Sequence, residues 1–239
     1  MRVRVGTSGF SYDAWTGPFY PAGTKAGARL AYYATRLDAV EINNTFYRMP
    51  RAALLEAWRD QVPDGFVFVL KAPQRITHVK RLAASAAEDV KYLLEAAAAL
   101  TGKRGPFLFQ TPPHLRKDAA RLREFLTFLP EGTPAAFEFR HESWQDDEVR
   151  AALAERGAAL CLADTDEGET PPLVATGSFG YLRLRRADYG AAELARWAEQ
   201  VLAQPWDEAF VFFKHEDAGR GPALAAEFKK AVDAGRGGG

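Results

Sequence analysis

The sequence predicts an α/β fold, a (β/α)8 barrel of the TIM type. Three observations support this prediction: short apolar runs alternate with helix-like stretches, eight such runs occur, and most of them end in a charged or amide residue. Alternation with short connections is typical of parallel β/α architecture. In a parallel barrel the C-terminal ends of the strands converge on one face, which is where active sites lie. The pattern therefore predicts where a site lies, although it names no reaction.

Each expected strand is an apolar run that stops at polar or turn residues. The turn Pro63-Asp64-Gly65 precedes the third run, and Pro112-Pro113 stops the fourth. The eight expected strands are Arg2–Gly6, Ala39–Asn43, Phe66–Lys71, Pro106–Gln110, Ala135–Arg140, Ala158–Asp164, Gly180–Arg185 and Ala209–Lys214.

Between these runs, apolar residues at spacings of three and four predict helices, as Leu122, Phe125, Leu126 and Leu129 illustrate. The connection Glu167–Phe179 differs, because it is rich in Gly, Pro and Thr. We expect an irregular loop there, in place of the helix between strands six and seven. The expected helices are Ala26–Arg36, Ala52–Asp60, Ala87–Thr101, Asp118–Leu129, Asp146–Glu155, Ala191–Leu202 and Pro222–Ala234.

Composition limits the class of protein. A chain of 239 residues with 47% hydrophobic content can bury one large core, and we expect one barrel domain over residues 1–236 and a flexible glycine tail over 237–239. The 31 basic and 31 acidic residues cancel, so bulk charge does not favour a protein that coats nucleic acid or an anionic membrane. Any anion binding must be local.

The single cysteine, Cys161, excludes an intramolecular disulfide framework, and its apolar surroundings favour a small buried residue. A strand begins at Val3 with no preceding leader, and no apolar stretch approaches the ~18 residues of a membrane span. We expect a cytoplasmic protein with no membrane partner. The sequence leaves the oligomeric state open.

Side chains alternate along a strand, so residue parity separates the barrel lumen from the helix-facing surface. Phe137 and Phe139 belong against the helices, which turns Glu138 and Arg140 inward. By the same argument the lumen also receives Glu41 and Asn43 from strand two, Tyr181, Arg183 and Arg185 from strand seven, and Phe212 and Lys214 from strand eight. Lys71, Gln110 and Asp164 end their strands and are expected at the rim.

The expected lumen thus contains three acidic side chains and a larger number of basic ones. The acidic residues are Glu41, Glu138 and Asp164, and the basic residues are Lys71, Arg140, Arg183, Arg185 and Lys214. One interpretation is a self-satisfied network of ion pairs that holds the strands together, because unpaired buried charge is costly. The other is that the surplus cations bind an anionic ligand such as a phosphate or carboxylate.

Four segments resemble a known family. They are Gly6–Tyr12 (GTSGFSY), Trp15–Pro21 (WTGPFYP), Val40–Arg48 (VEINNTFYR) and Phe137–Trp144 (FEFRHESW). In this order they are similar to the DUF72 (YecE-like) family, over Val3 to about Phe228. The resemblance implies a TIM-type barrel and no established activity, because the family is a domain of unknown function. A likeness of such folds to apurinic endonuclease and xylose isomerase barrels is analogy only.

The chain departs from a common pattern of the family after strand eight. Paired asparagines often occur there, whereas this sequence has Lys214-His215-Glu216-Asp217. A ligand contact made by those amides is therefore not expected here.

General acid–base chemistry requires a titratable group beside the substrate. Glu41, Glu138 and His141 are the candidate catalytic residues, with a loop histidine or an ion-pair role as the alternatives. The candidate substrate-binding residues are Asn43, Tyr47, Lys71, Gln110, Arg140, Trp144, Asp164, Arg185, Lys214 and His215. The strand-end lysines Lys71 and Lys214 offer a further alternative, a Schiff base with a carbonyl substrate.

Cofactors are not indicated by any motif. The chain has four histidines and many cations near the expected site, which disfavours a multinuclear zinc centre. No metal site is assigned, and a single divalent ion such as Mg²⁺ stays as an alternative. No phosphate-binding loop or dinucleotide fingerprint occurs. The cofactor is therefore unknown.

Aromatic residues are dense in the loops after strands one, two and five, and they either form a packed cap or offer stacking surfaces. They are Phe10, Tyr12, Trp15, Phe19, Tyr20, Phe46, Tyr47 and Trp144.

We expect an enzyme, a hydrolase, lyase or isomerase, that acts on a small phosphorylated or otherwise anionic substrate at the strand ends. The alternatives are a non-catalytic barrel that binds nucleic acid or a metabolite, and a hydrolase of the phosphodiesterase or endonuclease kind.

Overall fold

The computed structural model describes residues 1–167 and 169–237. Within them, eight parallel strands follow one another around a closed barrel, and β8 pairs with β1 to complete the ring. The strands are β1 (Arg2–Ser8), β2 (Ala39–Ile42), β3 (Val67–Lys71), β4 (Arg104–Gln110), β5 (Ala135–Glu138), β6 (Ala159–Asp164), β7 (Phe179–Leu184) and β8 (Glu208–Phe213). The predicted TIM-type barrel is confirmed.

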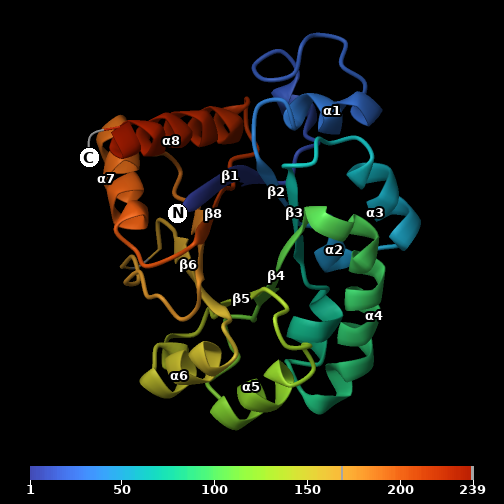
Figure 1. The fold of residues 1–239 in the computed structure, drawn as a ribbon, viewed down its shortest axis with the longest axis vertical. Helices are drawn as coiled ribbons and strands as arrows, with labels where there is room; N and C mark the ends of the chain where they lie inside the picture. Colours follow the sequence, from blue (N-terminus) through green and yellow to red (C-terminus); the bar gives the residue numbers. More distant parts are fainter. Residues whose placement is uncertain (168, 238–239) are drawn as a thin grey trace.

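Helices surround the barrel on its outer face (Figure 1). Their buried faces follow the predicted periodicity; in α5, for example, Leu122, Phe125 and Leu126 are buried, and the Asp118 side chain caps the helix by accepting a hydrogen bond from the amide of Arg121. The main helices are α1 (Ala26–Tyr33), α3 (Ala52–Arg59), α4 (Ala87–Ala97), α5 (Ala119–Leu126), α6 (Asp147–Glu155), α7 (Ala191–Leu202) and α8 (Arg220–Gly237).

Short helical turns that the sequence pattern did not predict lie in the connections. They are too brief to show a 3.6-residue apolar period. They comprise α2 (Asn44–Tyr47), the 3₁₀ helices η1 (Asp13–Trp15), η3 (Ala84–Ala86), η4 (Ala98–Lys103) and η5 (Glu142–Trp144), and the π-helical turn η2 (Arg75–Val79). Two of them, α2 and η2, directly follow strands β2 and β3 and therefore lie beside the ends of those strands.

The irregular connection between β6 and β7 is confirmed for the residues that the structure describes there, 165–167 and 169–178, which contain no helix or strand. Its final part is fastened to β6 through the hydroxyl of Thr176, which accepts from the amide of Leu160 and donates to the carbonyl of Ala158. Of the predicted glycine tail, Gly237 ends α8, and 238–239 lie outside the described residues.

Two apolar layers result from the alternation of side chains. The larger lies between strands and helices and contains Phe109, Phe137, Leu182 and Phe213, as parity predicts. The second fills the lumen and comprises Ala39, Val67, Val69, Leu108, Ala136, Ala159, Cys161, Tyr181, Phe210 and Phe212. Because these side chains pack the interior of the barrel, a polar site has room only at its C-terminal end.

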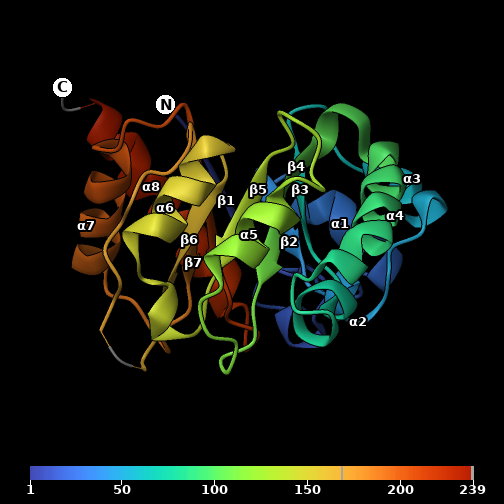
Figure 2. The same cartoon turned by 90° about the horizontal axis from the view of Figure 1, so that it is seen from below.

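The two ends of the barrel differ. Figure 2 shows the N-terminus and the end of α8 at the end of the barrel where the strands begin, and α2 at the opposite end. In the described part of the chain, every helix is too short or too polar to cross a lipid bilayer.

Candidate functional site at the barrel mouth

Three charged side chains meet at the C-terminal end of the lumen. Arg183 of β7 lies between Glu41 of β2 and Glu138 of β5, with Nη2 2.8 Å from Glu41 Oε1 and Nη1 2.5 Å from Glu138 Oε2. All three side chains are almost completely buried. Removing the guanidinium would leave two buried carboxylates without their shared partner. The three residues therefore form one unit, the Arg183 clamp.

Each carboxylate of the clamp has further hydrogen-bond donors. Ser8 Oγ donates to Glu41 Oε1 at 2.6 Å and Tyr181 OH to Glu41 Oε2 at 2.6 Å. Gln110 Nε2 donates to Glu138 Oε1 at 2.8 Å. All four carboxylate oxygens are thus satisfied.

The carboxylates of the clamp stay ionised. Burial alone would raise the pKa of Glu41, but the charge of Arg183 and the hydrogen bonds from Ser8, Tyr181 and Arg183 bring the pKa below its ordinary value. At Glu138 the effect of burial is likewise outweighed, here by the charges of Arg183 and Arg185 and the hydrogen bond from Gln110, so that its pKa is also lowered. Neither carboxyl group holds a proton near neutral pH.

Lys71, the last residue of β3, is buried beside the clamp. Its Nζ lies 4.1 Å from the centre of the Phe46 ring, which α2 supplies. The carbonyl of Lys71 accepts a hydrogen bond from Thr45 Oγ1 at 2.7 Å, which fastens α2 to the end of β3. Burial and the nearby charge of Arg183 lower the pKa of Lys71 to about 8.

Three more cations complete the mouth. Arg185 is half-buried, with Nη1 3.7 Å from Glu138 Oε1, whereas Arg140 and Lys214 are exposed. Burial, followed by the charge of Arg185, lowers the pKa of Lys214. Among the described residues, no acidic side chain lies within ion-pair distance of Lys71, Arg140 or Lys214. The two carboxylates of the clamp thus face five cations, three of which have no ion-pair partner in the described part of the chain.

Part of the mouth forms a pocket of about 390 Å³ between the ends of β5 to β7 and the start of the loop after β6. Its wall contains two arginines, Arg140 and Arg185, and four acidic residues, Glu138, Asp166, Glu167 and Glu169. A pocket of this volume suits a small ligand. The cations that lack a carboxylate partner are the groups best placed to fix an anionic part of that ligand.

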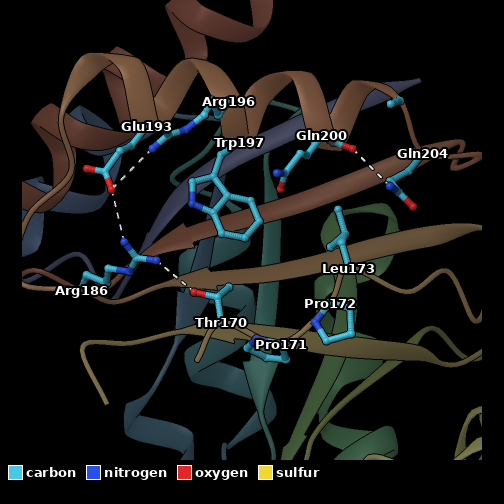
Figure 3. Close-up of a pocket in the computed structure, with 11 residues that line it drawn as sticks. Thr170, Pro171, Pro172, Leu173, Arg186, Glu193, Arg196, Trp197, Gln200 and Gln204 are labelled. Atoms are coloured by element: carbon cyan, nitrogen blue, oxygen red, sulfur yellow. Dashed lines mark hydrogen bonds and ion pairs between the residues drawn. The ribbon is translucent and has the colours of Figure 1, made fainter. Parts of the chain in front are cut away.

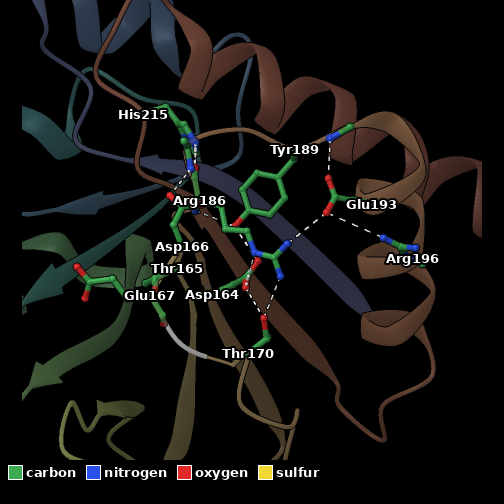
Figure 4. A network of polar contacts seen from close by, with 12 residues as sticks. Asp164, Thr165, Asp166, Glu167, Thr170, Arg186, Tyr189, Glu193, Arg196 and His215 are labelled. Carbon is green, nitrogen blue, oxygen red and sulfur yellow. Dashed lines mark hydrogen bonds and ion pairs between the residues drawn. The ribbon is translucent and has the colours of Figure 1, made fainter.

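Asp164 does not lie at the rim of the lumen, where the sequence predicted it. The lumen side of β6 is occupied by residues of the other parity, such as Cys161, so Asp164 points to the outside of the barrel. There its Oδ1 accepts from Arg186 Nε at 3.0 Å and its Oδ2 from Tyr189 OH at 2.9 Å (Figure 4). Arg186 also donates to Thr170 at 3.0 Å and to Glu193 at 3.2 Å, which joins the loop after β6 to α7.

His215 also belongs to this outer network, not to the mouth. Its Nε2 pairs with the carbonyl of Arg186, and its ring packs against Tyr189 (Figure 4). Burial lowers the pKa of His215. Its expected role in substrate binding finds no support in this position.

The remaining predicted residues differ in their positions. Trp144 is buried, stacks on Phe139 with ring centres 4.3 Å apart and donates from Nε1 to the carbonyl of Leu115, so it is part of the core. Tyr47, the last residue of α2, is 76% exposed, and His141 is partly buried in the loop after β5. His141 Nδ1 accepts from the amide of Ser143 at 3.1 Å, which leaves the proton of the neutral ring on Nε2. Asn43 presents a buried Oδ1 with no hydrogen-bond partner in the described part of the chain.

The aromatic residues after β1 pack against one another as a cap. Trp15 is buried in contact with Tyr12, Phe19 and Tyr20, and its Nε1 donates to the carbonyl of Glu216. The cap therefore joins the loops after β1 and β8. Because these rings pack against one another, they do not form a stacking surface for a ligand.

A larger cavity, of about 570 Å³, lies outside the barrel between the loop after β6 and α7 (Figure 3). Trp197, Leu173 and Pro172 line it, and its charged residues Arg186 and Glu193 are already paired with each other. The cavity occupies the place where a helix would cover β6 and β7 in a regular barrel. It offers no unpaired cation of the kind found at the mouth, apart from the exposed Arg196, 4.0 Å from Glu193.

In residues 1–167 and 169–237, no three His, Cys, Asp or Glu side chains come together in a way that could hold a metal ion.

The sequence analysis assigned no site role to Arg183, Ser8, Tyr181 or Phe46. Strand parity had placed Tyr181 and Arg183 in the lumen, but it could not show that one guanidinium spans two glutamates. Ser8 pairs in register with Glu41, and that register depends on how β1 and β2 align. Phe46 was included only among the aromatic residues of the loops.

Comparisons with known proteins point to one family. A family model described as "Protein of unknown function DUF72" matches residues 4–238. The UPF0759 protein YecE of Escherichia coli (strain K12) is 27% identical over 143 residues, 57% of this chain and 52% of YecE. The UPF0759 protein YunF of Bacillus subtilis (strain 168) is 27% identical over 132 residues, 52% of this chain and 47% of YunF. The chain thus aligns with about half the length of these curated relatives.

Solved structures agree with the fold. A DUF72 family protein from Thermotoga maritima MSB8 superposes with a TM-score of 0.85 at 27% identity, covering 98% of this chain and 100% of that protein. A DUF72 family protein from Enterococcus faecalis V583 gives a TM-score of 0.79 at 23% identity, covering 97% and 95% of the two chains.

Proposed function

We propose that this chain, which belongs to the DUF72 family of proteins of unknown function, is an enzyme that acts on a small phosphorylated or carboxylated substrate at the barrel mouth. The observation that supports it is a group of cations there that lack ion-pair partners. Lys71, Arg140 and Lys214 have no carboxylate partner within the described residues, and Arg185 has only a distant one at 3.7 Å. An anion that binds among them would supply the missing negative charge.

The clamp gives this proposal a rigid base. Arg183 is held by two carboxylates whose every oxygen is satisfied, so its charge is fixed in position beneath the mouth. Fixed charges stabilise an anion without the cost of reorganising solvent or side chains. We assign Glu41 and Glu138 to holding Arg183 in place, because ionised and fully hydrogen-bonded carboxylates are poor proton donors.

Proton transfer then falls to Lys71, whose pKa of about 8 is closer to neutral pH than that of an ordinary lysine. His141 lies in the loop after β5 with its Nδ1 engaged by the amide of Ser143, which leaves its Nε2 for a contact with substrate.

The test is binding of inorganic phosphate, measured by isothermal titration calorimetry and by thermal stabilisation. We expect the variant with Arg140→Met and Lys214→Met together to bind phosphate at least about tenfold more weakly, because two charge-assisted contacts are lost. A matched control with Arg123→Met and Lys91→Met removes two cations from the outer helices and should bind as the unmodified protein does. Equal affinity in the double variant and the control would contradict the proposal.

A panel of sugar phosphates and small phosphorylated acids then addresses the substrate. Stabilisation by any of them follows the logarithm of ligand concentration over Kd, so thermal shifts rank the panel directly. We expect the best ligand to exceed inorganic phosphate and to lose its advantage in the Arg140→Met and Lys214→Met variant.

A further inference from the structure

Lys71 is a buried charged residue that no ion pair in the described ranges accounts for. Its side chain is buried, yet its Nζ makes no hydrogen bond or ion pair with any residue in the described ranges and lies over the face of the Phe46 ring. The clamp already satisfies Glu41 and Glu138 through Arg183, so Lys71 is not needed as their counterion. A lysine that only stabilised the fold would be expected to have a carboxylate partner.

The surroundings of Lys71 hold it at one place. Nζ lies over the Phe46 ring at 4.1 Å from its centre, and the ring of His78 packs perpendicular to that of Phe46 with the two centres 4.9 Å apart. Thr45 Oγ1 of α2 donates a hydrogen bond to the backbone carbonyl of Lys71. His78 Nδ1 is hydrogen-bonded to Thr77 Oγ1 at 2.8 Å. The amine is thus presented at the mouth by an ordered shell, on the strand end where barrel active sites lie.

Burial is the main cause that favours the neutral form of Lys71 by lowering its pKa. The charges of Arg183 and Arg185 act in the same direction, whereas Glu41 and Glu138 oppose them. At pH 7.5 a lysine of pKa about 8 is about a quarter neutral, against about one part in a thousand for an ordinary lysine. Only the neutral amine is a nucleophile.

We propose that Lys71 forms an imine with the carbonyl group of an anionic substrate, so that the substrate class is aldehydes or ketones bearing a phosphate or carboxylate. This rests on the proposed function, because the anion is what the neighbouring cations bind. The uncharged amine provides the nucleophile, and Arg140, Arg185 and Lys214 provide the contacts for the anionic end.

The chemistry balances without a redox partner. The nitrogen lone pair of Lys71 attacks the carbonyl carbon, the C=O electron pair moves to oxygen, and proton transfer from nitrogen to oxygen gives a carbinolamine. Protonation of its hydroxyl lets the C–O bond break, which releases water and leaves a C=N⁺H group. The iminium then withdraws electrons from the adjacent carbon, which is how lysine-dependent barrels labilise bonds beside a carbonyl.

The experiment is trapping on the intact protein with pyridoxal 5′-phosphate, a phosphorylated aldehyde. The mixture is reduced with sodium borohydride, which adds hydride to the iminium carbon and makes the link permanent, and the modified lysines are identified by peptide mass spectrometry. Pyridoxal, which lacks the phosphate, is the paired probe, and exposed Lys91 is the internal reference. Thermal stabilisation by inorganic phosphate is recorded separately.

We expect Lys71 to be labelled at least about tenfold more than Lys91, phosphate to suppress that labelling, and Lys71→Arg to abolish it. Labelling spread evenly over surface lysines overturns the imine. Absence of labelling at Lys71 while phosphate still stabilises the protein overturns the imine and leaves the proposed function standing. Equal labelling of Lys71 by both probes without any effect of phosphate supports the imine and contradicts anion binding.

Discussion

At the scale of single residues, Arg183 decides the character of the site. One guanidinium pairs with two buried carboxylates, and burial of a second negative charge beside it is tolerable only because Ser8, Tyr181 and Gln110 donate to the remaining oxygens. The arrangement makes the clamp a structural part of the barrel. The pKa of Arg183 is raised by Glu41 and Glu138 against the opposing effect of its burial.

Arg183→Met should therefore destabilise the protein by about 3–5 kcal/mol, because it leaves two buried carboxylates facing each other without a cation. Urea unfolding followed by circular dichroism measures the loss. The matched control is Arg123→Met, which breaks the exposed pair with Glu155 and should change the free energy of unfolding by less than about 1 kcal/mol. Similar effects of the two substitutions would show that the clamp is not a stabilising unit.

Lys71 acts on stability in the opposite direction. Its pKa is about 8 in the folded protein and 10.5 ordinarily, so between pH 8 and pH 10.5 the unfolded chain binds more protons than the folded one. Stability rises with pH wherever the unfolded state binds more protons. Below pH 8 the lysine is charged in both states, and its contribution to stability is at its least favourable.

Lys71→Met should accordingly be more stabilising at pH 7 than at pH 10.5, by no more than about 3 kcal/mol. The measurement is the free energy of unfolding of variant and parent at both pH values, so that groups that titrate in both proteins cancel. Lys91→Met serves as control, with a difference that should not change with pH. If the effect of Lys71→Met proved independent of pH, Lys71 would have an ordinary pKa. That result would contradict the proposal that its neutral amine is the nucleophile.

At the scale of elements, strand parity predicted much of the site. It turned Glu41, Glu138 and Arg183 into the lumen, and they do meet there. It failed where a residue ends its strand. Asp164 was expected at the rim, as were Lys71 and Gln110. The parity of β6 turns it outward instead, where Arg186 and Tyr189 donate hydrogen bonds to it. The polar residues that attract Asp164 come from beyond the end of β7, which no local pattern reveals.

The connection after β6 explains how Asp164 finds polar partners outside the barrel. With no helix described between β6 and β7, a loop and α7 share the space, and the Arg186 network with Thr170 and Glu193 fastens them together. The Gly, Pro and Thr content of residues 167–179 predicted an irregular loop in place of a helix. It could not predict which charges fill the gap, because tertiary contacts between distant segments depend on how the elements are placed.

The short turns α2 and η2 illustrate a second limit. Phe46 and His78 stand on them and hold Lys71 at the mouth. The sequence placed Phe46 among loop aromatics and His78 shortly after strand three. Neither residue type nor spacing indicated that their rings pack edge to face beside a strand-end lysine.

At the scale of the whole molecule, the formal net charge is zero, so bulk charge does not attract a polyanion. A small anion needs only the local cations of the mouth. A long polyanion would need cations beyond the mouth as well. The two candidate functions therefore differ in how many phosphates the protein neutralises.

The distinction predicts how binding of a single-stranded oligonucleotide depends on salt. For single strands the logarithm of the binding constant falls with the logarithm of salt concentration with a slope of about −0.7 per neutralised phosphate. The mouth offers Lys71, Arg140, Arg185 and Lys214, so the slope for a ten-nucleotide oligothymidylate should be no steeper than about −3, a loss of at most about 50-fold between 50 and 200 mM NaCl. Fluorescence anisotropy measures it.

The variant with Arg140→Met and Lys214→Met should make that slope shallower by about 1.4, since two phosphate contacts are removed. A slope of about −5 or steeper in the parent, unchanged in the variant, would mean that other cations on the surface bind the strand. The barrel mouth would then not be the main binding site, and the nucleic-acid alternative would take precedence over a small anionic substrate.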